Sequence, residues 1–193
     1  MVKRPSICVF CGSSSNVAEV HKQSARDMGR ILGEAGMDVV YGGGHVGLMG
    51  IVADSALAAG SRVTGIIPRF LDEWEVGHEG LDELVVTETM HERKHLMYDR
   101  ADAFVTLPGG LGTFDETIEV ITWTQLGLSK KPVILVNING YWSRFLDLIQ
   151  FSIDEGFARP EHAKILTVVD TPGEVPAAIG SLPDIPSPEG KWI

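Results

Sequence analysis

The sequence predicts an α/β protein in three layers, with a parallel sheet of about seven strands and helices on both faces. Short runs rich in β-branched residues alternate with longer amphipathic stretches along the chain. Several of the short runs are almost wholly apolar, which is typical of strands that are buried on both faces. Regular alternation of strands and helices predicts right-handed strand–helix–strand units, and such units build a parallel sheet.

Seven strands and six helices are expected in alternation. The strands are expected at Ser6–Phe10, Met37–Tyr41, Arg62–Ile67, Glu83–Thr87, Ala103–Leu107, Pro132–Val136 and Ile165–Val169. The helices are expected at Val17–Glu34, Leu48–Ala59, His91–Arg100, Thr113–Leu126, Trp142–Glu155 and Gly173–Ile179. The acidic stretch Pro68–Gly80 is expected to be an irregular loop near the carboxyl edge of the sheet.

Length and composition predict one domain. The chain has 193 residues, of which 44% are hydrophobic and 22% are charged, and a chain of this size and balance can bury a full core. No repeat or linker divides it. Residues 1–182 are therefore expected to form a single domain, and the proline-rich residues 183–193 are expected to form a loose tail.

The charge and the cysteines indicate a cytoplasmic protein without a nucleic-acid or membrane partner. The net charge of −10 disfavours binding to nucleic acid or to an anionic membrane. The N-terminal residues do not resemble a signal peptide, and no stretch reaches the ~20 apolar residues of a membrane helix. Cys8 and Cys11 cannot make a disulfide framework, which suits a reducing compartment.

Three glycine-rich turns follow predicted strands, at Cys11–Ser15, Gly42–Gly50 and Pro108–Thr113. Ligands of parallel α/β sheets bind beyond the carboxyl ends of the strands. Glycine lets backbone N–H groups approach an anion, and the helix that follows adds a positive dipole end. The turns therefore predict a cradle for a nucleotide or sugar phosphate, although each could also be a tight turn that needs positive φ. The cradle residues are expected to be Gly12, Ser13, Gly43, Gly44, Gly109, Gly110, Leu111, Gly112 and Thr113.

Two familiar nucleotide signatures are incomplete. Gly42, Gly44 and Gly47 fit the G-x-G-x-x-G pattern, which also expects an acidic residue about 20 positions later to bind the ribose. The next strand ends at Thr64–Pro68 without an acid, so a dinucleotide is disfavoured. The Gly-Lys-Ser/Thr ending of a P-loop is absent as well, which disfavours triphosphate hydrolysis.

Three motifs together resemble those of the LONELY GUY family, the cytokinin riboside 5'-monophosphate phosphoribohydrolases. Pro108–Glu116 fits the family's P-G-G-x-G-T-x-x-E signature, Met90–Lys94 fits its second motif, and Tyr41–Gly50 fits its glycine-rich turn. Their order and spacing agree over nearly the whole chain, from about Ser6 to Val169. The family's older label, lysine decarboxylase, has no support from a pyridoxal phosphate site in this sequence.

The resemblance implies a modified Rossmann fold and a homodimer with active sites near the subunit interface. It implies hydrolysis of an N6-substituted adenosine monophosphate, or of AMP itself, to the free base and ribose 5-phosphate, with no metal or cofactor. By position, Arg93 and Glu116 match the family's catalytic pair. Lys94, Glu75 and Thr122 match nucleotide-binding positions.

The implied chemistry suits these two side chains. Cleavage of an N-glycosidic bond develops positive charge on the sugar, and a carboxylate such as Glu116 can stabilise that charge or activate the attacking water. Arg93 can hold phosphate or ribose oxygens in a rigid fork, or it can help the base to leave. The sequence leaves these roles of Arg93 open.

Several alternatives compete with this interpretation. Thr113–Glu116 also fits a capping box, in which the Glu side chain bonds back to the Thr113 N–H. His91–His95 matches the H-E-x-x-H helix of zinc proteases, but its middle pair is Arg-Lys and no third ligand follows. Cys8–Cys11 is a C-x-x-C pair that begins inside a strand, where core packing is favoured over redox chemistry. A non-catalytic nucleotide-binding protein on the same fold is the main functional alternative.

Overall fold

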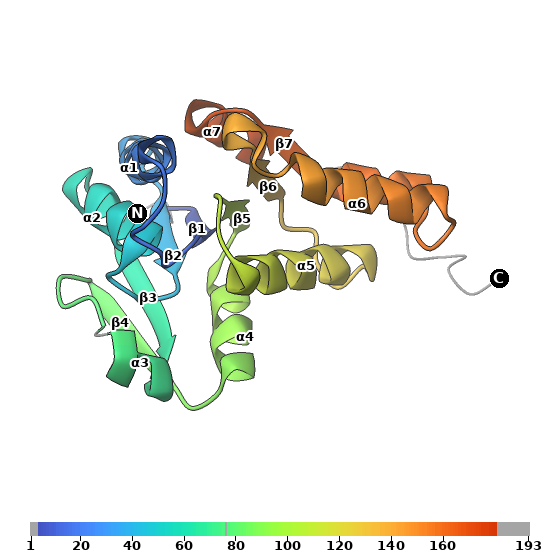
Figure 1. The fold of residues 1–193 in the computed structure, drawn as a ribbon. Helices are drawn as coiled ribbons and strands as arrows, with labels where there is room; N and C mark the ends of the chain where they lie inside the picture. Colours follow the sequence, from blue (N-terminus) through green and yellow to red (C-terminus); the bar gives the residue numbers. More distant parts are fainter. Residues whose placement is uncertain (1–3, 76, 181–193) are drawn as a thin grey trace.

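A single parallel sheet forms the centre of the molecule (Figure 1). The computed structural model describes residues 4–75 and 77–180, without the side chains of Trp74 and Glu75. The seven strands lie in the order β4-β3-β2-β1-β5-β6-β7, and all neighbours are parallel. They are β1 (Ser6–Phe10), β2 (Asp38–Tyr41), β3 (Val63–Pro68), β4 (Glu83–Thr87), β5 (Ala103–Thr106), β6 (Val133–Val136) and β7 (Leu166–Val169).

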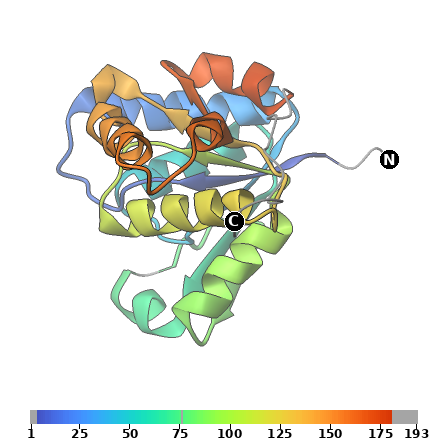
Figure 2. The ribbon, with the colours of Figure 1, turned by 90° about the vertical axis from the view of Figure 1, so that its right-hand side faces the viewer.

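Helices cover both faces of this sheet, as Figures 1 and 2 show. They are α1 (Glu19–Glu34), α2 (Gly47–Ala58), α3 (Arg69–Glu75), α4 (Met90–Arg100), α5 (Leu111–Gln125), α6 (Ser143–Asp154) and α7 (Val175–Ile179). Short 3-10 turns lie at Ile138–Gly140, Pro160–Ile165 and Pro172–Glu174. The predicted three-layer α/β class is confirmed.

The side chains of β1 alternate between two hydrophobic cores. Ile7 and Val9 belong to the core beneath α1, α2 and α7, where Met28 of α1 is fully buried. Cys8 and Phe10 point to the opposite face and pack with α4 and α5. Because successive side chains of a strand point to opposite faces, a strand covered on both sides must be apolar throughout, which is why the sequence shows an unbroken apolar run here.

The strand order reverses between β1 and β5. From β1 the chain moves outward through β2 and β3 to β4, and it then returns to place β5 on the other side of β1. Ligands of such sheets bind in the crevice at this switch point. The turns after the two strands are tied together there, because the Gly12 N–H donates to the Pro108 carbonyl at 3.1 Å.

Two sequence-based expectations about local structure are wrong. The stretch Pro68–Gly80 is not wholly irregular, since Arg69–Glu75 forms α3; two turns of helix are too short to show a clear 3.6-residue period. Helix α5 begins at Leu111 instead of Thr113. The expected tail at residues 183–193 lies outside the described residues.

Helix α6 lies apart from the sheet, on the right in Figure 1. None of its twelve residues is buried, although the helix is strongly amphipathic in sequence. Leu148 and Phe151 are 62% and 59% exposed. Over residues 4–75 and 77–180, no helix combines the length and the apolar character needed to cross a membrane.

Candidate active site

A buried ion pair joins α4 to α5 beside the switch point. Arg93 Nη1 donates to Glu116 Oε1 at 2.6 Å, and the two side chains are only 8% and 10% exposed. Arg93 Nε donates to the Ile66 carbonyl of β3 at 3.0 Å. With its fork held from two sides, the guanidinium has a single fixed orientation.

The start of α4 places Arg93 in this position. Thr89 caps the helix by accepting a hydrogen bond from the Glu92 N–H at 3.1 Å, and Glu92 Oε2 accepts from the Glu88 N–H at 2.9 Å. The two bonds satisfy the N–H of Glu92 and the N–H of Glu88, the residue before the cap. Glu92 therefore stabilises the helix end, and the next residue in the chain, Arg93, turns inward.

Gly42, at the end of β2, leaves the space that the guanidinium occupies. A Cβ atom at this position would lie 2.3 Å from Arg93 Nη2 and 3.1 Å from Met49 Sδ. No real Cβ atom can come so close to another heavy atom. A larger residue at this position would therefore displace the guanidinium from the place that it occupies.

Burial and the neighbouring cation act in opposite directions on Glu116. Loss of water raises the pKa of the Glu116 carboxyl, the nearby Arg93 guanidinium lowers it, and the net pKa lies above the ordinary glutamate value. A carboxyl with a raised pKa is well suited to exchange a proton with a substrate or with water. A perturbed acid beside a ligand crevice is a common mark of a functional site.

The capping-box alternative for Glu116 is wrong. Because α5 begins at Leu111, with Gly110 as its N-cap, Glu116 lies in the second turn of the helix. Its carboxylate bonds to Arg93 instead of to the Thr113 N–H. The earlier helix start was hidden in the sequence by the glycines of this turn, which are poor helix formers.

Lys94 of α4, a predicted nucleotide-binding residue, contacts Asp115 and Glu119 of the neighbouring helix α5. Its Nζ is 3.1 Å from Asp115 Oδ2 and 3.1 Å from Glu119 Oε1. Burial lowers the pKa of Lys94, but the hydrogen bonds and charges of Glu119 and Asp115 outweigh that effect and raise it. The structure therefore pairs this cation with two carboxylates.

Turns one and three of the predicted cradle come together. Gly12, Ser13, Gly109 and Gly110 line one cavity of about 300 Å³ at the carboxyl ends of β1 and β5. A Cβ atom at Gly109 would lie 2.1 Å from Thr113 Oγ1 and 2.8 Å from the Gly12 nitrogen. Close approach of two backbones is therefore what requires glycine at this position.

The second turn packs differently. Gly43 has φ of 79°, and its carbonyl accepts a hydrogen bond from the His78 N–H at 3.3 Å. Gly44 makes an isolated bridge to Gly77. The tight-turn alternative, which requires positive φ, therefore holds for Gly43, and neither Gly43 nor Gly44 lines the cavity of the other two turns.

The first turn of α5 shows a sharp contrast in burial. Leu111 is 83% exposed, whereas Thr113 is 4% exposed. A Cβ atom at Gly112 would meet nothing within 4 Å. Thr113 thus supports the turn from inside, while Leu111 and Gly112 face outward from this chain.

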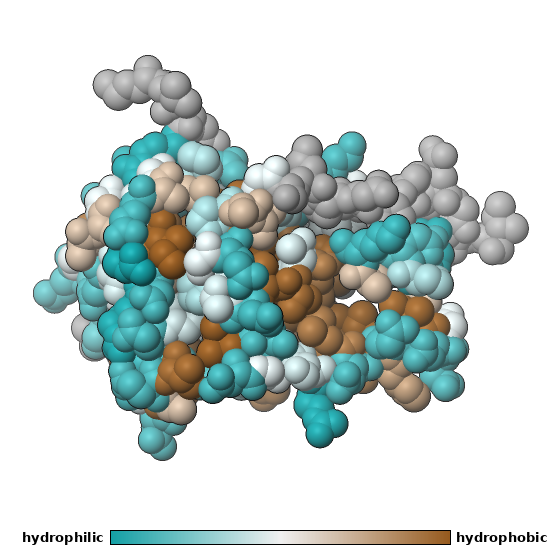
Figure 3. Space-filling view, turned by 90° about the horizontal axis from the view of Figure 1, so that it is seen from above, coloured by the Kyte–Doolittle hydropathy of each residue, from teal (hydrophilic) through white to brown (hydrophobic). Residues whose placement is uncertain are grey.

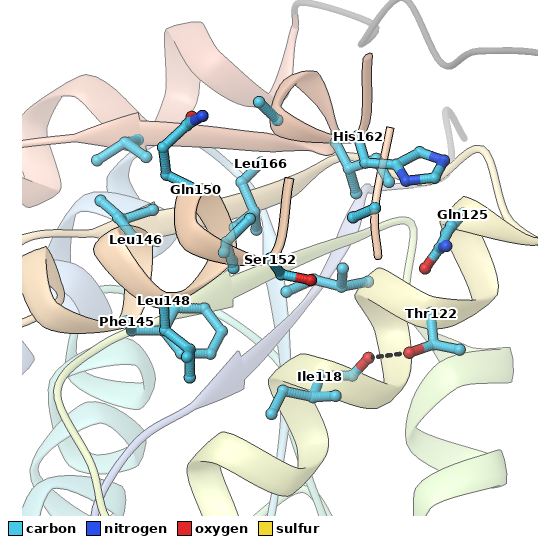
Figure 4. A pocket seen from close by; sticks show the side chains of 16 residues that line it. Ile118, Thr122, Gln125, Phe145, Leu146, Leu148, Gln150, Ser152, His162 and Leu166 are labelled. Carbon is cyan, nitrogen blue, oxygen red and sulfur yellow. Dashed lines mark hydrogen bonds between the residues drawn. The ribbon is translucent and has the colours of Figure 1, made fainter. Parts of the chain in front are cut away.

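Two predicted binding residues lie away from this cavity or cannot be placed. Thr122 is exposed on α5, where its hydroxyl donates to the Ile118 carbonyl at 2.8 Å, and it lines a groove between α5 and α6 (Figure 4). Glu75 is the last residue of α3, and its side chain lies outside the described part of the structure.

The zinc and redox alternatives receive no support from the geometry. His95 Nε2 lies 3.3 Å from Asp99 Oδ2 on the exposed side of α4. Within the described ranges, no three His, Cys, Asp or Glu side chains gather as metal ligands would. Cys8 and Cys11 are buried free thiols, and burial raises the pKa of both above the ordinary cysteine value, which makes them poor nucleophiles.

Sequence reasoning missed three features of the site. It did not find the Ile66 carbonyl as a partner of Arg93, because backbone groups leave no sequence signal. It also missed His21 and Tyr141, which line the cavity of the first and third turns. Tyr141 follows β6, so the rule that ligands bind beyond carboxyl strand ends could have pointed to it.

Comparison with known proteins places the chain among close relatives. Residues 49–179 match the family described as "Possible lysine decarboxylase". A cytokinin riboside 5'-monophosphate phosphoribohydrolase of Arabidopsis thaliana is 46% identical over 160 residues, which cover 83% of this chain and 74% of that protein. A probable enzyme of the same name from Oryza sativa subsp. japonica is 42% identical over 169 residues, covering 88% of this chain and 69% of that protein.

Among solved structures, the fold is similar to that of the Moco carrier protein from Chlamydomonas reinhardtii. The TM-score is 0.70 at 21% identity, and the match covers 92% of this chain and 96% of that one. At this identity the likeness shows a shared fold only.

Proposed function

This chain belongs to the LONELY GUY family, and we propose that it hydrolyses the N-glycosidic bond of cytokinin nucleotides or AMP. The products are the free base and ribose 5-phosphate. The observation that carries this proposal is the buried pair of Arg93 and Glu116, which lies against Gly42 in the second glycine-rich turn. Neither residue lines the cavity of the first and third turns. These two side chains match the catalytic positions that the family motifs imply.

Glu116 is the group that meets the developing charge. As the bond from C1' of the ribose to the base breaks, its electron pair goes to the base and positive charge grows on the sugar. Water adds to C1' and loses a proton to the Glu116 carboxylate, and a proton reaches the departing base. Arg93 holds the carboxylate in one orientation, so little reorganisation is needed during the reaction.

Base release from nucleotides tests the proposal. Wild-type protein is expected to release base from AMP and from N6-isopentenyl-AMP, and the rate is expected to be unchanged by EDTA. The corresponding nucleosides should react much more slowly, because the glycine-rich turns contribute binding energy only through the 5'-phosphate. Chromatography of the released base measures all four substrates.

The outcomes separate the proposal from its alternatives. Equal rates on nucleotide and nucleoside would contradict a phosphate cradle. Tight nucleotide binding without any base release would favour a non-catalytic carrier on this fold. Loss of activity in EDTA, with recovery on adding Zn²⁺, would favour a metal-dependent hydrolase at the helix of His91 and His95.

The pH dependence follows from the raised pKa of Glu116. The reaction requires the carboxylate, so kcat/KM is expected to fall on the acid side with an apparent pKa above the usual glutamate value of about 4.3. The folded state binds this proton more tightly than the unfolded state does. Ionisation of Glu116 therefore lowers the free energy of unfolding as pH rises through that pKa.

A pH–rate profile of kcat/KM for AMP measures this fall in rate at acid pH, the acid limb of the profile. An acid limb at or below about pH 4.3, where an ordinary solvated glutamate would titrate, would contradict the assignment of a buried carboxylate as the reacting group.

A homodimer is part of this proposal, and the surface between α5 and α6 supports it. Side chains of both helices line an apolar groove of about 420 Å³, among them Ile118, Leu146 and Leu148 (Figure 4). Seen from above, apolar surface gathers on the side where α6 lies (Figure 3). Exposed apolar surface of this kind marks an interaction site. Thr122 lines the same groove, so a role in nucleotide binding requires a partner subunit here.

Leu148→Asp tests the dimer. The wild type is expected to have the mass of two chains by light scattering, and Leu148→Asp is expected to shift it towards one chain, because a charge cannot be buried without a partner. Val20→Asp on α1 is the control, since Val20 is also exposed (40%) but does not line the groove. A monomeric wild type, or a Leu148→Asp variant that stays dimeric, would contradict this interface.

We also infer one catalytic domain over residues 1–182 and a cytoplasmic location. One sheet uses strands from Ser6–Phe10 to Leu166–Val169, which supports the single domain. The buried free thiols of Cys8 and Cys11 are compatible with a reducing compartment.

A further inference from the structure

Two side chains outside the proposed catalytic pair, those of His21 and Tyr141, line the cavity at the switch point. Besides the glycine-rich turns, the residues around this cavity include His21 from the first turn of α1 and Tyr141 from the segment after β6. The cavity's lining residues, all within the described chain, include no Asp or Glu, although the protein carries a net charge of −10. A cavity that offers donors and no carboxylate favours an anionic group.

His21 lines this cavity, and only one of its two ring nitrogens is buried without a partner. Its Nδ1 is buried and has no hydrogen-bond partner among the described residues, whereas the residue as a whole is only partly buried and lines the cavity. Nε2 is therefore the nitrogen that a ligand can reach. A phosphate oxygen that accepts a hydrogen bond from Nε2 would fix the proton on that atom.

Tyr141 connects His21 to the third glycine-rich turn. The two rings meet edge to face, with centroids 5.7 Å apart and an interplanar angle of 74°. The Tyr141 hydroxyl donates to the Gly109 carbonyl at 2.5 Å. Because the C=O and N–H of a trans peptide point in opposite directions, this bond turns the Gly110 N–H away from Tyr141 and fixes the orientation of the turn.

We propose that His21 and Tyr141 form the phosphate-recognising wall of this cavity. His21 donates a hydrogen bond from Nε2 to the 5'-phosphate of the substrate, and Tyr141 is a positioning residue that holds His21 and the Gly109 peptide together. This inference rests on the proposed function, since it assigns the place of the substrate's phosphate.

Two substitutions of His21 separate a ligand contact from a packing role. His21→Phe keeps an aromatic ring against Tyr141 but removes the donor, and it is expected to raise KM for AMP about tenfold, with a smaller change in kcat. His21→Gln removes the ring but places an amide N–H near the position of Nε2, and it is expected to keep most of the affinity. A role in packing alone predicts the reverse order, so that result would overturn the proposal.

Calorimetric titration with ribose 5-phosphate distinguishes this inference from the proposed reaction. The Kd is expected to rise in His21→Phe and to stay close to the wild-type value in His21→Gln, while binding of free adenine is the same in all three proteins. If this order appears in a protein that releases no base, the reaction is wrong and the phosphate wall stands. If ribose 5-phosphate binds equally to all three, or if adenine binding depends on His21, the phosphate wall is wrong.

Discussion

Glu116→Gln is expected to lower kcat for base release by about 10²- to 10⁴-fold, the usual contribution of a positioned acid–base group. Glutamine has the same shape, and its side-chain oxygen can still accept the hydrogen bond from Arg93 that the carboxylate accepts at 2.6 Å. The substitution removes the negative charge that, in the proposed reaction, stabilises the developing cation. Nucleotide affinity is expected to change little, because the phosphate site that we propose lies at the turns after β1 and β5 and does not include Glu116.

Glu83→Gln is the matched control for this variant. Glu83 also forms an ion pair with an arginine, at 2.8 Å from Arg100 Nη1, but it lies at the amino end of β4, away from the crevice. Single-turnover rates, nucleotide Kd and melting temperature are measured for both variants. Glu116 would lose its catalytic role if a folded Glu116→Gln protein released base at the wild-type rate.

Gly42→Ala is expected to reduce kcat/KM by about 10²-fold, although it leaves both residues of the proposed catalytic pair, Arg93 and Glu116, in the chain. The added methyl group would lie 2.3 Å from Arg93 Nη2, so the guanidinium has to move away from its bonds to Glu116 and Ile66. A small displacement of a reacting group can cost this much in rate. Glu116 then loses the neighbour that lowers its pKa, and the acid limb of the pH–rate profile is expected to move to higher pH.

Gly173→Ala serves as the control, because a methyl group there would meet only Thr171 Oγ1, at 3.8 Å. The pH profile is the decisive measurement for the pair of variants. A Gly42→Ala protein with a normal rate and an unchanged acid limb would show that the position of the guanidinium does not matter for the reaction.

The order of elements could be predicted from the sequence because hydrophobic patterning is a local property. Each of the seven strands falls within a few residues of its expected position, and the apolar run of β1 already indicated burial on both faces. The start of α5 could not be predicted in this way. Gly110 and Gly112 favour a loop by propensity, yet Gly110 is the N-cap of α5 and Gly112 lies in its first turn.

In the candidate site, too, some features could be predicted from the sequence and others could not. Family motifs named Arg93 and Glu116 as a pair, and the structure brings them into contact. No sequence pattern could show that Gly42 makes room for Arg93, because that relation depends on how far β2 and α4 stand apart. Nor could it show that Lys94 is held by Asp115 and Glu119. Side chains four residues apart on one helix are recognisable from sequence, whereas contacts between helices depend on the packing of the whole sheet.

The hydrogen bond from Gly12 to the Pro108 carbonyl has a consequence for the order in which the protein folds. The two residues stand in different halves of the chain, so the bond closes a very long loop, and contacts of that kind form slowly. The partners Arg93 and Glu116 are only 23 positions apart and can meet sooner. A nucleotide held by both turns would therefore bind only after the last long-range contacts have formed. Such a ligand binds the native state and not the folding intermediates or the transition state. It would therefore lower the rate of unfolding and leave the rate of folding unchanged.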